Sequence, residues 1–585
     1  MRTLPIPFAL VVLLLPAPSS AAVPPGAPPA PEAIARTART AHPRLAPPLP
    51  ALVAARDLPA GAEARLGLDS LLGPDGRVEV VIETETDGPA AAALAAAAAE
   101  LGAEIHTAHG ALLFARVGPD SLPELADLPG VRRVRRPYRA TPDLVSEGVV
   151  LTGAARLHAA GHRGAGVRVG VLDCGGFAGY AGLLGSELPA AVTLWTGGTS
   201  GDPVGADEHG TACAEIVHDM APGASLYLAH DGNEADFYGA VDWLVAQGVD
   251  IISYSCGWWL PAPYDGSGAP HNPVVAKVEA ARQAGILWVN SAGNYANGQI
   301  YQGTYEKHPD FSWHSFDGDW ANRFGYLYAG RPYVLTLTWD DWPADPATAG
   351  ASHDYDVDLW RWDGAYWIVV ASSAAVQNGA PGALPAEVIE FIPAVSDWYY
   401  VTVSKKASPR DDFLRLQGAG GGKLEHSVVA RTIATPADSP AAMTVGALHW
   451  SSLALEPFSS RGPTLGPGGT PSGGHLKPDL VAPDAVSTVT YGASNGQPWT
   501  GGGTGFFGTS ASCPHVAGGA ALLLAQFPHL TADELADLLR DRALDVGVPG
   551  PDPETGYGLL QLDFDLVWAD SFEAGSVATW SAHLP

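Results

Sequence analysis

The feature that most constrains the fold is an alternation of strand-like and helix-like segments between residues 167 and 294. Apolar runs and helix-forming runs follow one another in the order strand 167–173, helix 209–220, strand 224–230, helix 235–248, strand 249–255, helix 272–285 and strand 286–294. Such alternation predicts a parallel sheet with helices on both faces. The pattern resumes near residue 431 and closes with a helix over 531–543, where Thr531 and Glu534 form a capping-box pattern.

The first 22 residues have the composition of a signal peptide. Arg2 supplies the charge, "FALVVLLL" the apolar core, and "SSAA" a small-residue cleavage site after about Ala22. No other apolar run approaches the roughly 20 residues that span a bilayer. We therefore expect a secreted protein without a membrane span. The formal net charge of −30 argues against nucleic acid or an anionic membrane as a partner.

At 585 residues the chain is too long for one domain, and two regions precede the α/β pattern. Residues 23–76 are rich in Pro and Ala and predict a linker. Residues 77–140 contain strand and helix signals in the order βαββαβ, which is the ferredoxin-like pattern.

Residues 300–430 interrupt the α/β pattern. They are rich in Trp and Tyr, and they predict strands at 332–339, 355–362, 366–372, 386–392 and 398–404 without a convincing helix. We expect an inserted antiparallel β-sandwich or jelly roll. In this region Asp354, Asp356 and Asp358 project from one face of a strand, and they are either solvated, which we favour, or bridged by a cation.

Four polar residues occupy the positions at which open α/β sheets usually carry catalytic and ligand-binding residues. Asp173 and Asn294 end strands, whereas His209 and Ser510 begin helices. Ser510 precedes an apolar helical run with Pro514 expected in its first turn, so it is a nucleophile or only a helix cap. A nucleophile needs a base and a group that orients the base.

These residues can supply each role of an acyl-transfer site. His209 would be the base for Ser510, and Asp173 would fix the tautomer of the imidazole. The backbone N–H of Ser510 and the side-chain amide of Asn294 would bind the oxyanion. Taken singly, each residue has a structural interpretation as a loop carboxylate, a helix cap or a turn residue. Taken together, those interpretations are much less probable.

The segments around these residues resemble the subtilisin-like serine peptidases, the subtilases. "GVRVGVLDCGG" resembles the Asp segment of that family, "EHGTACAEIVHDMAPGA" its His segment, "SAGN" its oxyanion segment and "GTSASCPHVAG" its Ser segment. "FSSRGP" and "KPDLVAP" also match. The resemblance implies a serine endopeptidase that acts on proteins or peptides, with a discontinuous catalytic domain at 141–299 and 431–565. Its chemistry requires no cofactor, and the question of structural calcium stays open.

The resemblance also implies roles for the remaining regions. Residues 77–140 resemble an inhibitor-type propeptide, which would act as an intramolecular inhibitor until it is cut within "RRPYRATPDLVSEGV". Ser255 and Gly257 match the strand that pairs with substrate, and Ala434 the base of the pocket for the residue before the scissile bond. The 300–430 insertion would stand beside the cleft and restrict substrate entry. No role is assigned to the tail, residues 566–585.

The chain also departs from the family pattern. All four cysteines lie in these motifs, at 174, 213, 256 and 513. Either a pair forms a disulfide or they are buried thiols, and we favour thiols because helix interiors and strand ends rarely meet disulfide geometry. The His segment is too short to contain the calcium loop of many family members. Two other functions stay open: a sedolisin-type serine-carboxyl peptidase, and a catalytically inactive protein that binds protein or glycan.

Overall fold

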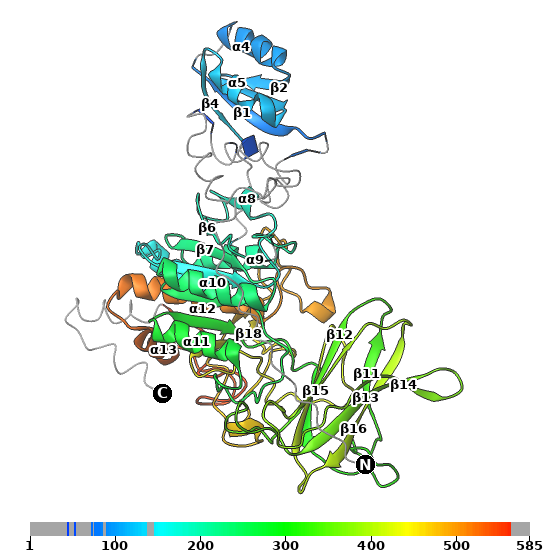
Figure 1. The fold of residues 1–585 in the computed structure, drawn as a ribbon. Helices are drawn as coiled ribbons and strands as arrows, with labels where there is room; N and C mark the ends of the chain where they lie inside the picture. Colours follow the sequence, from blue (N-terminus) through cyan, green and yellow to red (C-terminus); the bar gives the residue numbers. More distant parts are fainter. Residues whose placement is uncertain are drawn as a thin grey trace, which may run out of the picture. The chain divides into compact units, whose positions relative to one another are not determined.

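The computed structural model describes residues 75–85, 89–136, 145–199 and 201–562, with residues 44–45, 49, 52–53 and 72–73. The predicted signal peptide, most of the linker and the C-terminal tail lie outside the described residues. The chain divides into two compact units, 1–64 with 71–138, and 65–70 with 139–585 (Figure 1). No helix in the described parts combines the length and apolar character needed to cross a membrane.

The first unit has the predicted βαββαβ order. Its sheet has the strand order β2-β3-β1-β4, and every pair in it is antiparallel. Apolar side chains of β1, β3 and α5 form its core. The elements are β1 (Val78–Thr84), α4 (Pro89–Glu100), β2 (Glu104–His109), β3 (Leu112–Val117), α5 (Leu122–Asp127) and β4 (Val131–Arg135).

The second unit is built on the predicted parallel sheet, which has seven strands. Their order is β19-β18-β9-β8-β5-β7-β6, and all neighbouring pairs are parallel. Such a sheet buries both faces, which explains its continuous Val, Ile and Leu runs. The strands are β5 (Arg168–Asp173), β6 (Thr193–Leu194), β7 (Ser225–His230), β8 (Ile251–Tyr254), β9 (Leu287–Ser291), β18 (Ala442–His449) and β19 (Leu480–Asp484).

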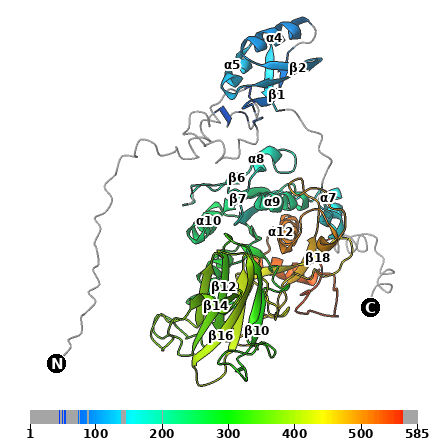
Figure 2. The ribbon, with the colours of Figure 1, turned by 90° about the vertical axis from the view of Figure 1, so that its right-hand side faces the viewer.

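Helices cover both faces of this sheet (Figures 1 and 2). Side chains of α9, α12 and α13 pack with one face, and those of α10 and α11 with the other. The predicted capping box is present, because Thr531 accepts from the Glu534 backbone and Glu534 from the Thr531 backbone. The helices are α6 (Gly148–Leu151), α7 (Ala154–Ala159), α8 (Tyr180–Leu183), α9 (His209–Met220), α10 (Glu234–Gln247), α11 (Pro273–Gln283), α12 (Thr509–Gln526) and α13 (Ala532–Asp541).

The insertion is the expected antiparallel sandwich. One sheet has the order β10-β17-β12-β15 and the other β11-β16-β13-β14, with an aromatic and aliphatic core between them. Sequence patterns predicted five of these strands and missed β10, β11 and β17. The strands are β10 (Ile300–Thr304), β11 (Asn322–Leu327), β12 (Tyr333–Trp339), β13 (Asp354–Trp362), β14 (Trp367–Ser373), β15 (Ala386–Phe391), β16 (Asp397–Ala407) and β17 (Phe413–Ala419).

The aspartate row of β13 has partners within the protein. Asp356 forms an ion pair with Lys406 at 2.8 Å, and Asp358 accepts a hydrogen bond from the Ser372 hydroxyl. All three carboxylates are half-buried rather than fully solvated. Among the described residues, they do not form a cluster with metal-ligand spacing.

Candidate active site

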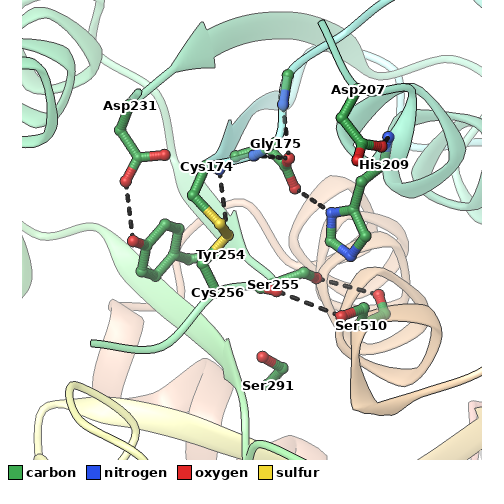
Figure 3. Close-up of a disulfide and its surroundings, with 12 residues drawn as sticks. Cys174, Gly175, Asp207, His209, Asp231, Tyr254, Ser255, Cys256, Ser291 and Ser510 are labelled. Carbon is green, nitrogen blue, oxygen red and sulfur yellow. Dashed lines mark hydrogen bonds and ion pairs between the residues drawn. A yellow bond between two sulfur atoms is a disulfide. The ribbon is translucent and has the colours of Figure 1, made fainter. Parts of the chain in front are cut away.

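Asp173 and His209 form the centre of the site. Asp173 ends β5 and is fully buried, and His209 begins α9. The Nδ1 atom of His209 lies 2.7 Å from Oδ2 of Asp173, while Oδ1 of Asp173 accepts the N–H groups of Gly175 and Gly176 at 2.9 and 3.1 Å (Figure 3). Because a carboxylate only accepts, this contact holds the proton on Nδ1 and leaves Nε2 as the basic atom.

The charged groups around His209 stabilise its protonated form. Burial by itself lowers the pKa of His209, but the charge of Asp173, the hydrogen bond to it and the charge of Asp207 outweigh burial. The pKa of His209 is therefore raised above the ordinary histidine value. The same carboxylate that orients the imidazole thus also stabilises its protonated form.

Ser510 is the second residue of α12, and it does not cap that helix. The N-cap position belongs to Gly508, whose φ of 115° suits glycine, and no side-chain capping bond is present. The Ser510 hydroxyl donates to the backbone oxygen of Ser255 at 3.3 Å. Among the hydrogen bonds of the described residues, none joins Ser510 to His209. His209 is not a cap either, because Glu208 occupies that position.

The position of Pro514 differs from the expectation. It is the sixth residue of α12, beyond the first turn, because the helix already begins at Thr509. A proline there removes the N–H that would bond the carbonyl of Ser510, four residues earlier. That carbonyl instead accepts from the Ser255 hydroxyl at 3.0 Å and from the Cys213 thiol at 3.6 Å. Two hydrogen bonds therefore tie the main chain and side chain of Ser510 to Ser255.

Asn294 is held by the residue that precedes Ser510. Its Oδ1 atom accepts from both the N–H and the hydroxyl of Thr509, each at 3.0 Å, and the same hydroxyl accepts the N–H of Gly293 at 3.2 Å. With Oδ1 engaged, Nδ2 is the free donor of this side chain, and it lies beside Gly508. The N–H of Ser510 belongs to the first turn, which has no intrahelical acceptors. Two donors are thus available for an oxyanion.

Ala434 and Gly257 lie close to each other, next to an aromatic ring that sequence analysis overlooked. A Cβ built on Gly257 would lie 2.9 Å from Tyr295 Oη and 3.0 Å from the Cβ of Ala434. One built on Gly293 would lie 2.5 Å from the Tyr295 ring. The ring also contacts Trp259 edge-on at 4.6 Å. Only the place of Tyr295, directly after Asn294, could have indicated its proximity to the site.

The cysteines divide into one disulfide and two thiols. Cys174 and Cys256 form a disulfide with a Cα–Cα distance of 6.3 Å, whereas Cys213 and Cys513 are buried and free (Figure 3). The preference for four thiols was therefore wrong for one pair. Leu172 of β5 lies opposite Tyr254 of β8, and each cysteine lies two residues after its member of this pair. Equal offsets on neighbouring parallel strands bring the two sulfur atoms together.

Metal-ligand spacing occurs at one place among the described residues. Ligand atoms of Asp173, His209 and Cys213 lie within 4.8 Å of one another. Both oxygens of Asp173 already bind Gly175, Gly176 and His209, and burial raises the pKa of the Cys213 thiol well above its ordinary value. A protonated thiol and an engaged carboxylate are poor metal ligands.

The fold and this site define an α/β protein with a hydrogen-bonded Asp–His pair and a serine in the first turn of a helix. The profile of the Subtilase family matches residues 164–315 and 402–558, more than half of the chain. The chain therefore belongs to the subtilase family.

Individual relatives match shorter parts of the chain. The serine protease AprX of Bacillus subtilis (strain 168) is 37% identical over 126 residues, which is 19% of this chain and 27% of AprX. Fervidolysin of Fervidobacterium pennivorans is 33% identical over 132 residues, 22% of this chain and 18% of that protein. The chain thus spans about a quarter or less of these relatives. The structure of the Clostridium perfringens CspB protease superposes with a TM-score of 0.51 at 18% identity, covering 71% of this chain and 96% of CspB, which supports the fold alone.

Proposed function

We propose that this chain is a secreted serine endopeptidase that hydrolyses protein and peptide substrates, with Asp173, His209 and Ser510 as its catalytic triad. The observation that carries the proposal is the 2.7 Å contact between buried Asp173 and Nδ1 of His209, beside the helix start that presents Ser510. This contact also favours the triad over the sedolisin-type arrangement, which does not use a histidine base. Membership of the subtilase family supports the same function.

The first chemical step is acylation of Ser510. Its side chain turns from the Ser255 carbonyl toward His209, and Nε2 of His209 removes the hydroxyl proton as the oxygen attacks the scissile carbonyl. The resulting oxyanion accepts hydrogen bonds from the Ser510 N–H and from Nδ2 of Asn294. His209 then gives its proton to the leaving amine as the C–N bond breaks.

The second step releases the acyl group. Water takes the place of the amine, and Nε2 of His209 removes its proton as the water oxygen attacks the ester carbonyl. The ester bond breaks, and the proton passes to the oxygen of Ser510. Asp173 keeps its charge throughout and stabilises the imidazolium that forms in each step.

The region around Tyr295 would restrict the residue that precedes the scissile bond. By family resemblance, Gly257 and Ala434 border the pocket for that residue, and the Tyr295 ring lies next to Gly257 and Gly293. The ring would narrow that pocket, so we expect Gly or Ala to be preferred over a large side chain. Ser255 and Gly257 would pair with the extended substrate backbone, because strand addition recognises any extended peptide.

The insertion, residues 300–430, would influence the cleft through the segment that follows the substrate strand. Nε2 of His271 lies 2.5 Å from the Pro343 oxygen, and the His271 and Trp342 rings meet edge-on at 5.7 Å. The insertion would limit entry of folded proteins more than that of short peptides. Trp342→Ala is the test, and equal kcat/KM changes for a protein and a short peptide would contradict this role.

The N-terminal regions would make the protein a secreted, self-processed zymogen. Residues 1–22 would direct export, residues 23–76 form a linker, and residues 77–140 act as inhibitory propeptide. The described part of 77–138 belongs to a compact unit, and its buried apolar side chains form a core, which supports this role. The catalytic domain would comprise 141–299 and 431–565; the family profile matches 164–315 and 402–558, so it omits the central part of the insertion.

The test compares secreted wild type with Ser510→Ala, by intact mass and by labelling with a fluorophosphonate serine-hydrolase probe. The wild type should lose about residues 1–140 and take the label, whereas Ser510→Ala should stay full length and unlabelled. Ser186→Ala, at an exposed serine, serves as the matched control and should behave as wild type. If wild type and Ser510→Ala mature alike and neither takes the label, the chain is a binding protein and the proposal is wrong.

A further inference from the structure

One face of the inserted sandwich presents a row of exposed aromatic rings. In the sheet β11-β16-β13-β14, alternate residues such as Tyr355, Tyr399 and Val401 point into the core. The side chains between them point outward, and four strands contribute an aromatic residue. We call these residues the aromatic face: Tyr326 (43% exposed), Trp398 (45%), Trp362 (45%) and Trp367 (38%).

The strand register aligns these rings across the sheet. Tyr326 lies opposite Trp398, and Trp362 lies opposite Trp367. The rings of each pair meet near edge-on, at 5.7 Å and 5.6 Å. Trp367 also contacts Tyr400 at 4.9 Å, so neighbouring rings hold it in place. The row is therefore preorganised, and a ligand would pay little entropy to order it.

The aromatic face is the outer surface of one sheet of the sandwich, and the other sheet is the one that packs against the catalytic core. The opposite sheet makes that contact, because Gln417 of β17 bonds the hydroxyl of Tyr264 and the Arg415 guanidinium lies 4.1 Å from the Tyr264 ring centre. Two sheets of a sandwich turn their outer faces in opposite directions. The aromatic face thus points away from the catalytic core.

Two arginines of the aromatic face are paired with carboxylates. Arg361 pairs with Asp397 at 3.4 Å, and Arg323, which lies over the Trp398 ring at 4.8 Å, pairs with Glu425 at 2.9 Å. At its border, Arg331 lies 5.2 Å from the ring of Tyr328, which contacts Tyr326. A surface on which most cations are neutralised attracts nucleic acid or acidic lipids only weakly. It complements an uncharged ligand. The net charge of −30 of the whole chain opposes polyanions further.

The polar atoms of the aromatic face are available to a ligand. Within the described part of the chain, no hydrogen bond engages the indole N–H of Trp362, Trp367 or Trp398, whereas that of the more buried Trp360 donates to Thr402 at 2.8 Å. An exposed ring with a free N–H offers an apolar surface and a donor together. A ligand that has both C–H faces and hydroxyl groups complements the apolar ring and also accepts a hydrogen bond from its N–H.

We propose that the aromatic face binds a neutral polysaccharide. The C–H faces of successive sugar rings would stack on Trp398, Trp362 and Trp367, and their hydroxyl groups would accept from the free indole N–H groups. An extended, uncharged chain of rings matches the row in shape and in charge, as it does in the lectin members of two-sheet β-folds. This function is independent of peptide hydrolysis, and it would hold the protein on a glycan-containing material.

The test uses the full chain with Ser510→Ala, which excludes self-digestion, and measures its retention on cellulose, chitin, curdlan and starch. Retention on at least one is expected, and it should persist in 0.5 M NaCl because no charge is involved. Combining Trp362→Ala, Trp367→Ala and Trp398→Ala should weaken it about tenfold or more. Trp499→Ala, at an exposed indole of the catalytic unit, is the matched control and should bind normally.

Three results would overturn the proposal. The first is retention on none of the four polysaccharides. The second is retention that the triple variant does not weaken. The third is a dimer in analytical ultracentrifugation that the triple variant dissociates, which would make the aromatic face an interface between copies. Circular dichroism spectra of the triple variant and of Trp499→Ala should coincide, because the substituted side chains are exposed.

Discussion

The parallel sheet and the inserted sandwich use their sheets in opposite ways. Helices bury both faces of the parallel sheet, so its functional polar groups lie at the ends of strands, where Asp173 ends β5 and Ser255 follows β8. On an outer face of the sandwich, by contrast, four aromatic rings are exposed, one from each of four strands. A sheet covered on both faces can present functional groups only at the ends of its strands. An exposed sheet face can contact a ligand with side chains from several strands.

The surroundings of the two sites differ accordingly. Asp173 is fully buried and both its oxygens are engaged, which suits a group that must keep one orientation and one charge. Trp362 and Trp398 are nearly half exposed, and no described residue accepts a hydrogen bond from their indole N–H groups, which suits reversible contact with a large ligand. The two functions should therefore separate cleanly under mutation.

The largest effect is expected from His209→Ala. Loss of the base should lower kcat/KM for a peptide substrate by about ten-thousand-fold or more, because the triad acts as a unit. Retention on polysaccharide should not change. Initial rates with a fluorogenic peptide and a pull-down measure the two properties. If His209→Ala lost both peptide hydrolysis and polysaccharide retention, the two sites would be coupled, and the contrast between them would be wrong.

Asn294→Ala should have the next largest effect. Removing one oxyanion donor should lower kcat by roughly 100- to 1000-fold with a smaller change in KM, because the bond strengthens in the transition state. Asn297→Ala, at an exposed asparagine three residues later, is the matched control and should retain full activity. Equal losses in both variants would mean that Asn294 only supports the loop.

Tyr295→Ala should change preference more than rate. With the ring removed, the ratio of kcat/KM for peptides with Phe and with Ala before the scissile bond should rise about tenfold or more. Paired peptides that differ at that residue measure the ratio. A ratio unchanged from wild type would mean that the ring does not border the pocket.

The smallest effect is expected from Asp207→Asn. The base acts when it is neutral, so activity is lost as pH falls through the pKa of His209. The Asp207 charge contributes to raising that pKa. Its removal should therefore move the acidic limb of the pH profile of kcat/KM to lower pH, which initial rates measured across the pH range would show. Asp242→Asn, at an exposed aspartate paired with Lys277, should leave the limb in place. A limb that moves to higher pH would contradict the assignment of the base.

Much of the fold and site followed from local sequence. Strand and helix alternation predicted β5, α9 and β7, since apolar runs and capping signals are local properties. Three strands of the insertion were missed because they contain residues that strands usually avoid. Arg415 and Gln417 of β17 are buried, yet their partners, Arg431 and Tyr264, come from other parts of the chain. Only those distant partners make a buried polar strand stable.

By itself, the sequence determined the alternating order of elements, the residues of the proposed triad and the family to which the chain belongs. Tertiary structure alone decided which groups meet: the pairing of Cys174 with Cys256, the contact of the Tyr295 ring with Gly257, and the aromatic face. The physical reason is that propensity and periodicity act over a few residues. Strand register and side-chain packing, in contrast, join residues that lie far apart along the chain.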